Sequence, residues 1–327
     1  MTRYFATFTT GIQEIIGNRL QKIPRSELAV DELHDGLVLF TSAMSTGQLT
    51  ELRFFNNVFV LLADLGNQPT IDDAARAALT ADMSVLPAKA GFKIHTRQAN
   101  QTVGLKDLQA LQQAVSNANG GIPDSFKPDI ELLLWVRADG RALWGWQLPR
   151  PGFKTRKLEP GELRPELAHA MGLLAGLDHK DTVLDPFAGY GAIVRECLQG
   201  FHCEQVIGVE YNEHLVPHLK SIPHVIAKHG DAARLPHIET RSIDRVITDP
   251  PWGKYEHATP RQLEHLYYEA VVQMHRVLRA KGCIVMLTSV DFIGKLASEV
   301  GFTIEKQYNV LVNGQKSTLY KLRKLAA

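Results

Sequence analysis

The sequence predicts an α/β protein whose C-terminal half is a doubly wound, mostly parallel sheet. Two observations carry this prediction. Strands and helices alternate regularly after about residue 180, and such alternation produces parallel strands with helices on both faces. The last two strands instead flank Asn313-Gly314, the strongest short hairpin signal. The expected sheet therefore has seven strands and finishes in an antiparallel hairpin.

The N-terminal half predicts a different architecture of short strands and helices. A stretch rich in proline, glycine and basic residues, LPRPGFKTRKLEPGELRPE, separates the two halves as linkers do. Within residues 1–66 the expected order is strand, helix, hairpin, helix and strand, which suits a split ferredoxin-like domain. We predict these elements over residues 4–8, 11–20, 28–33 with 37–40, 48–55 and 58–63.

Residues 67–149 predict a second α+β domain. Helices are expected over 72–80 and 105–115, a strand over 92–96, and a closing hairpin around Asp139-Gly140, a favoured turn pair. Residues 150–162 are then the linker and residues 163–327 the third domain. Its strands are expected over 182–184, 205–209, 224–227, 243–248, 283–287, 303–312 and 315–321, with a long helix over 262–278.

Bulk properties exclude several classes of protein. A single core rarely grows to 327 residues, so two or more domains are expected. No apolar run approaches the roughly 20 residues of a membrane span, and the N-terminus has no signal-peptide core. The three cysteines have no ligand spacing, so we expect no metal and a cytoplasmic location. The oligomeric state stays open, with a monomer favoured.

The first chemical motif is VLDPFAGYGAIVREC. An apolar strand ends at Asp185, and a turn with Gly189 and Gly191 leads into a helix near Ala192. Glycines let backbone N–H groups approach a ligand at the carboxyl edge of the sheet, where open α/β folds bind. A dinucleotide fingerprint needs a third glycine where Val194 stands, so a dehydrogenase is the least favoured interpretation.

Two further acidic residues follow expected strands. Glu210 ends the second strand, where a carboxylate can accept both hydroxyls of a ribose. Asp231 follows the third strand, where it can accept a hydrogen bond from an adenine amino group, although a helix N-cap is the alternative role. Together with the glycine turn, they predict a nucleoside-containing cofactor.

The fourth motif, DRVITDPPWGKY, decides the chemistry. Two prolines cannot continue a central strand, so Asp249-Pro250-Pro251-Trp252 must form a fixed loop at the ligand edge. The Asp249 carboxylate and the Pro250 carbonyl are acceptors that concentrate the lone pair of an aromatic amine and stabilise its developing positive charge. Trp252 offers a flat face to an unstacked base. A structural proline turn is the alternative.

These motifs resemble the amino-methyltransferases of class I, whose fourth motif is (Asp/Asn)-Pro-Pro-aromatic. The glycine motif precedes the Asp249 motif, an order similar to that of RNA guanine-N2 methyltransferases and one class of DNA adenine methyltransferases. PDIELLLWVRADGRALWGWQL resembles the end of a THUMP domain, an RNA-binding module. FATFTTGIQEIIGNRL and LEPGELRPELAHAMGLLAGL resemble the ferredoxin-like start and the catalytic-domain entry helix of THUMP-containing methyltransferases.

The resemblance implies a tRNA guanosine-N2 methyltransferase that uses S-adenosyl-L-methionine. Many family members have tyrosine or phenylalanine where this chain has Trp252, which leaves base identity open. The implied roles are catalysis by Asp249, Pro250, Pro251 and Trp252; binding of the methionine end of the cofactor by Asp185, Pro186, Phe187, Gly189 and Gly191; binding of its ribose by Glu210 and its adenine by Asp231; and stacking on the target base by Trp252 or Tyr255.

The substrate is the least determined part of the prediction. A net charge of only +1 counts against a nucleic-acid substrate, but Arg150, Lys154, Arg156 and Lys157 form a basic stretch without an acidic residue and could contact phosphates. A solvated linker is the equal alternative. Ribosomal RNA is the nearest rival substrate, adenine N6 in DNA is less favoured because no helix-turn-helix is visible, and a non-catalytic RNA-binding platform is another rival.

Overall fold

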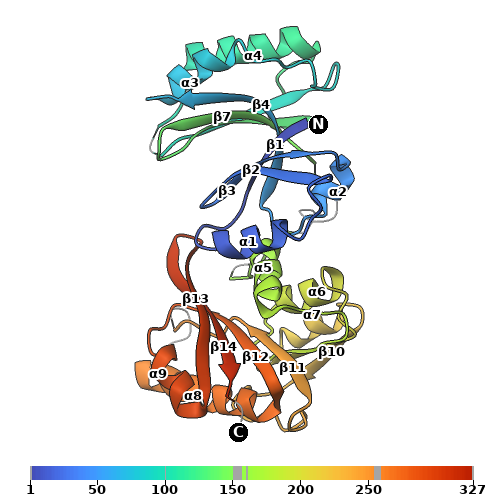
Figure 1. Cartoon of the computed structure of the whole chain (residues 1–327), viewed down its shortest axis with the longest axis vertical. Coiled ribbons are helices and arrows are strands. Elements are labelled where there is room, and N and C mark those ends of the chain that lie inside the picture. The colour runs from blue at the N-terminus through green and yellow to red at the C-terminus, as the bar shows by residue number, and fades with distance from the viewer. Residues whose placement is uncertain (1, 100, 150–156, 160, 254–258, 326–327) are drawn as a thin grey trace. The chain divides into compact units, whose positions relative to one another are not determined.

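The computed structural model describes residues 2–99, 101–149, 157–159, 161–253 and 259–325. The chain divides into two compact units (Figure 1). The N-terminal unit comprises Met1–Thr7 and Ile23–Gly152, and the C-terminal unit comprises Phe8–Lys22 and Phe153–Ala327. The division differs from the expected one, because residues 8–22 belong to the C-terminal unit rather than to a domain of residues 1–66.

The N-terminal unit contains one seven-stranded sheet among its described residues, in the order β2-β3-β1-β4-β7-β6-β5 (Figure 1). All neighbours are antiparallel except β5 and β6. The strands are β1 (Thr2–Thr7), β2 (Leu28–His34), β3 (Leu37–Ser42), β4 (Asn57–Asn67), β5 (Phe92–Arg97), β6 (Ile130–Val136) and β7 (Arg141–Gln147).

The long strand β4 joins the strands of the two expected N-terminal domains into that sheet. Its first residues pair with β1, where Tyr4 lies opposite Val60, and β4 also pairs with β7 from Phe59 to Asn67. Helices α3 (Ile71–Ala78) and α4 (Leu105–Asn119) contribute buried residues to a core around Trp144. The expected boundary at residue 66 therefore falls at the end of a shared strand.

Helix α2 (Thr46–Thr50) is shorter than the expected helix over 48–55 and begins earlier. The Ser45 hydroxyl accepts the Gln48 N–H while the Gln48 side chain accepts the Ser45 N–H, which is a capping box. This reciprocal pair fixes the first turn at Ser45. The sequence carried the signal in Ser-Thr-Gly-Gln, and the prediction missed it.

The C-terminal unit contains the predicted sheet, in the order β10-β9-β8-β11-β12-β14-β13 among its described residues (Figure 1). Strands β8 to β12 are all parallel to one another. Strand β14 pairs antiparallel with both β12 and β13, so the doubly wound sheet with a terminal hairpin is confirmed. The strands are β8 (Thr182–Asp185), β9 (Gln205–Glu210), β10 (Val225–His229), β11 (Ile243–Thr248), β12 (Leu278–Thr288), β13 (Phe302–Val312) and β14 (Gln315–Lys324).

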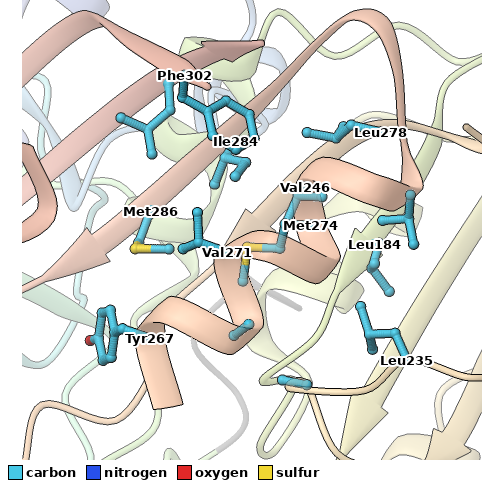
Figure 2. Close-up of a cluster of buried hydrophobic side chains, with 14 of the residues drawn as sticks. Leu184, Leu235, Val246, Tyr267, Val271, Met274, Leu278, Ile284, Met286 and Phe302 are labelled. Atoms are coloured by element: carbon cyan, nitrogen blue, oxygen red, sulfur yellow. The ribbon is translucent and has the colours of Figure 1, made fainter. Parts of the chain in front are cut away.

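Helices pack against both faces of this sheet, as alternate residues of β12 indicate. Ile284 and Met286 join a buried cluster with Met274 of the long helix α8 (Figure 2). Cys283, whose side chain points to the opposite face, contacts the carbonyl of Ala175 at the end of α5. The helices of this unit are α1 (Gln13–Leu20), α5 (Pro165–Ala175), α6 (Ala192–Gln199), α7 (Val216–Lys220), α8 (Pro260–Val277) and α9 (Ile293–Val300).

Helix α1 belongs to the C-terminal unit through specific contacts. Ile15 and Ile16 are buried, and Glu14 forms a 2.7 Å ion pair with Lys306 of β13. A Cβ atom at Gly11 would lie 1.8 Å from the carbonyl oxygen of Asn309. Only glycine allows this approach, so Gly11 fixes where the segment before α1 meets β13.

Within the described ranges, no helix is both long and apolar enough for a membrane span. All three cysteines are free and buried. The same ranges contain no cluster of three or more histidine, cysteine, aspartate or glutamate residues arranged to hold a metal ion.

Candidate active site

Four acidic residues gather at one edge of the C-terminal sheet. Asp185 ends β8, Glu210 ends β9, Asp231 follows β10, and Asp249 follows β11. These strands are parallel neighbours, so their carboxyl ends lie at the same edge. The arrangement brings together the acidic residues that the sequence singled out.

The turn between β8 and α6 is built around Glu210. Its Oε2 accepts the Gly189 N–H at 2.8 Å, and its Oε1 accepts the Asn212 N–H at 2.8 Å. Each oxygen retains a lone pair for a further donor. Gly189 has a φ of +52°, and no described atom outside its chain neighbours lies within 4 Å of where its Cβ would be. Open space thus adjoins a turn whose backbone is held by a carboxylate.

Gly191 has a different reason to be glycine. Its φ is +81°, and a Cβ there would lie 2.5 Å from the side chain of Ile222. Gly191 is the left-handed N-cap of α6, so the helix can begin directly after the turn. Pro186 is buried in this turn, and Phe187 is half-buried against the hydrophobic core.

Asp185 is only 1% exposed. Its Oδ1 accepts the Thr248 hydroxyl at 2.8 Å and the Phe187 N–H at 3.2 Å. Burial raises the pKa of Asp185 to about 7, with the nearby charges of Asp249 and Glu210 adding to the increase. This carboxyl joins β8, the glycine turn and β11.

Asp231 caps a turn rather than a helix. Its Oδ1 accepts the Ala233 N–H at 2.9 Å, and its carbonyl accepts the Arg234 N–H at 3.0 Å. The Gly230 N–H donates to the Glu210 carbonyl at 3.0 Å. These bonds place Asp231 directly beside the end of β9.

The loop after β11 closes on itself. The indole N–H of Trp252 donates to Oδ1 of Asp249 at 2.8 Å. Burial raises the pKa of Asp249 to about 7, and the hydrogen bond from Trp252 lowers it in part. Pro250 between them is buried. The loop therefore presents a fixed carboxyl group at the sheet edge.

A cavity of about 450 Å³ adjoins this loop. Trp252 and Phe292 contribute aromatic surface, and Glu264 and Asp291 contribute carboxylates. Gly253 has a φ of +77°, a left-handed conformation that favours glycine where the loop borders the cavity. Among the described residues, the lining consists of Trp252, Gly253, Pro260, Leu263, Glu264, Ser289, Val290, Asp291 and Phe292. A flat aromatic molecule fits the size and chemistry of this space.

A family model described as "UPF0020: RMKL-like, methyltransferase domain" matches residues 154–211 and 220–318. The C-terminal half of the chain belongs to this family. It is a methyltransferase. The matched residues contain the glycine turn, Glu210, Asp231, the loop at Asp249 and all the described residues of the cavity lining, so the site described above lies within the methyltransferase domain.

Two curated relatives and one solved structure resemble the methyltransferase. The tRNA (guanine(6)-N2)-methyltransferase of Thermus thermophilus is 24% identical over 337 residues, covering 98% of this chain and 99% of the relative. The tRNA (guanine(10)-N2)-dimethyltransferase of Methanothermobacter thermautotrophicus is 27% identical over 155 residues, 46% of each chain. The crystal structure of TrmN from Thermus thermophilus has a TM-score of 0.75 at 22% identity, covers 99% of this chain and 100% of that one, and shares its fold.

The sequence analysis did not identify the polar residues that support the Asp249–Trp252 loop of the methyltransferase from the protein interior. The Tyr267 hydroxyl of α8 donates to the Pro251 carbonyl at 3.0 Å and lies 2.7 Å from the hydroxyl of Thr288. Thr248, which donates to Asp185, was missed as well. Thr248 and Thr288 are polar residues at the ends of apolar strands, a signal that could have found them. The sequence around Tyr267 carries no comparable signal, because its hydroxyl contacts Pro251 and Thr288, which are far away in sequence.

The expected RNA-contacting residues are largely beyond what the structure describes. Arg150, Lys154, Arg156 and Tyr255 lie outside the described residues. Lys157 is described and exposed. The roles predicted for the basic stretch and for Tyr255 therefore stay predictions.

Proposed function

We propose that this methyltransferase transfers a methyl group from S-adenosyl-L-methionine to the exocyclic N2 of a guanosine in tRNA. The observation that carries the proposal is the Asp249 carboxyl, which is bonded to Trp252, a residue that itself lines a cavity, at the sheet edge that also holds the glycine turn. One half of this edge suits a nucleoside cofactor, and the other suits a planar base that carries an amine.

The cofactor half fits S-adenosyl-L-methionine. Open space beside Gly189 admits a ligand against the backbone of the turn, where a side chain would fill it. Glu210 would accept the ribose hydroxyls through its remaining lone pairs, and Asp231 would accept the adenine amino group. Asp185 would act mainly by holding the turn, since it is almost wholly buried. When bound, the cofactor supplies an electrophilic methyl group on its sulfonium.

The acceptor half fits an aromatic amine. The target base would enter the cavity beside Trp252 and Phe292, with its amine directed at Asp249 and the Pro250 carbonyl. Both groups accept N–H bonds, which directs the nitrogen lone pair toward the methyl carbon and stabilises the positive charge that develops. As the N–C bond forms and the C–S bond breaks, the surplus proton on nitrogen passes to the Asp249 carboxylate. A pKa of about 7 suits this acceptance.

The relatives support guanine in tRNA as the substrate. Two proteins that this chain resembles are named tRNA guanine-N2 methyltransferases, and one aligns along nearly all of both chains. That alignment includes the N-terminal unit, where an RNA-binding role was expected. The N-terminal unit would hold the tRNA while the C-terminal unit modifies it.

The test is transfer of labelled methyl groups from S-adenosyl-L-methionine to unmodified tRNA transcripts, followed by nucleoside analysis. We expect label in N2-methylguanosine with the wild-type chain and about 1,000-fold slower labelling with Asp249→Asn. Glu299→Gln, which changes an exposed carboxylate on α9, is the matched control and should behave as wild type. Label only in ribosomal RNA or in DNA adenine would retain the chemistry and refute the tRNA substrate.

A further inference from the structure

The hydrogen bond between Trp252 and Asp249 gives this tryptophan a role that a phenylalanine or tyrosine at the same position lacks. The indole N–H lies 2.8 Å from Oδ1 of Asp249. A phenyl ring has no N–H, and a phenol carries its hydroxyl at the far end of the ring. The bond is therefore a consequence of tryptophan in particular rather than of any aromatic residue.

We propose that Trp252 is a positioning residue that orients the Asp249 carboxylate and keeps it ionised for the target amine. The inference rests on the proposed amine methylation. With Oδ1 bound to the indole, Oδ2 and the second lone pair of Oδ1 are left for the substrate. The ring of Trp252 lines the cavity at the same time, so one side chain shapes the base site and aims the group that receives the amine.

The surroundings of Asp249 explain why such a donor is needed. Among the described residues, the ionisable groups that the surrounding elements bring to the site are Asp185 on β8, Glu210 on β9 and Tyr267 on α8, while Glu264 and Asp291 line the adjoining cavity. None of these supplies a positive charge. Burial favours the protonated form of Asp249, and a hydrogen bond to the charged form opposes that effect.

The loop that carries both residues is held at two points. The bond from Trp252 to Asp249 spans the loop from its last residue to its first. Tyr267 holds the Pro251 carbonyl from the side of α8. The two prolines between them have fixed φ angles and no N–H groups, so loss of the indole bond should free the Asp249 side chain without unfolding the loop.

The first experiment compares the pH dependence of kcat in the wild type and in Trp252→Phe, which keeps a flat ring but loses the donor. We expect the acid limb of the profile, which is the rise of kcat with pH, to occur roughly one pH unit higher in the variant. The reason is that loss of a hydrogen bond to the ionised carboxylate raises the pKa of Asp249. At pH 9 the variant should keep most of its activity. Trp146→Phe on β7 of the N-terminal unit is the matched control and should leave the limb unchanged.

The second experiment needs no activity. The bond is strong only when Asp249 is ionised, so Trp252→Phe should lower the free energy of unfolding more at pH 9 than at pH 6. When Trp252→Phe is introduced into a protein that already carries Asp249→Asn, its effect on the free energy of unfolding should no longer depend on pH. Should Trp252→Phe fail to fold, the indole N–H resonance of wild-type Trp252 should shift with pH near 7, and Asp249→Asn should abolish that shift.

The outcomes separate the two proposals. An unshifted acid limb in active Trp252→Phe, or an equal loss of stability at both pH values, would overturn the positioning role while leaving amine methylation intact. Wild-type protein that transfers no methyl group to any amine would refute the proposed function, and the stability and resonance measurements would still decide whether Trp252 holds an ionised Asp249.

Discussion

The two halves of the active edge are held by different kinds of bonds. On the cofactor side, backbone N–H groups of Gly189 and Asn212 donate to the carboxylate of Glu210. On the acceptor side, side chains hold the loop: Trp252 donates to Asp249, and Tyr267 donates to Pro251. Backbone donors are present whatever the side chain, whereas side-chain donors can be exchanged by mutation. If the proposed roles hold, the acceptor half is where a mutation would change the substrate while the cofactor site stays intact.

The largest expected effect separates the two halves by function. Asp249→Asn replaces an acceptor by an amide that cannot take up a proton. We expect turnover to fall by about 1,000-fold, in the range seen when a residue that stabilises transition-state charge is removed, with cofactor affinity nearly unchanged. Calorimetric titration with S-adenosylhomocysteine beside the methyl-transfer assay measures both quantities. A parallel loss of cofactor affinity would mean that the halves are not independent.

Glu210→Gln should produce the converse pattern. The amide can accept only one of the two backbone N–H groups and directs its own donors at the other. We expect cofactor affinity to fall by about 30-fold, since a charged acceptor contributes about 1.5–3 kcal/mol, with kcat at saturating cofactor within a few-fold of wild type. A large loss of kcat with unaltered affinity would assign Glu210 to the chemistry instead.

The raised pKa of Asp249 makes the acceptor half sensitive to pH. In the proposed mechanism the carboxyl must be ionised to accept the amine, and burial raises the pKa of Asp249 to about 7. Activity should therefore rise as the pH increases through 7 and level off above about 8; at pH 6 it should be about a tenth of the plateau. Single-turnover rates measured with saturating cofactor and tRNA test this limb. A flat profile between pH 6 and 8 would show that Asp249 is ionised throughout.

Tyr267→Phe should give the smallest effect and still sharpen the comparison. It removes the hydroxyl that holds the Pro251 carbonyl and faces Thr288 while keeping the buried ring. We expect turnover to fall by about five-fold, equivalent to about 1 kcal/mol, with cofactor affinity unaffected. Methyl-transfer kinetics at pH 8 provide the measurement. A loss as large as that of Asp249→Asn would show that the loop depends on α8 more than on its own indole bond.

Much of this arrangement was predictable because it is local in sequence. The parallel sheet follows from regular alternation, and the acidic strand ends follow from placing each motif at the carboxyl edge. The short helix α2 was misplaced because its capping box was overlooked. The residues behind the loop were not predictable in the same way: Tyr267 lies 16 residues from Pro251 and 21 from Thr288, and only tertiary packing brings them together.

The placement of α1 has a consequence for synthesis of the chain. The partners of this helix on β13 are made nearly three hundred residues after the helix itself, as the separation of Glu14 and Lys306 shows. During translation, the helix with its buried Ile15 and Ile16 therefore stays without its β13 contacts until that strand has been synthesised. The C-terminal unit therefore cannot be completed by its own contiguous segment, and a fragment that starts at residue 163 would lack a helix that is encoded far upstream of that segment.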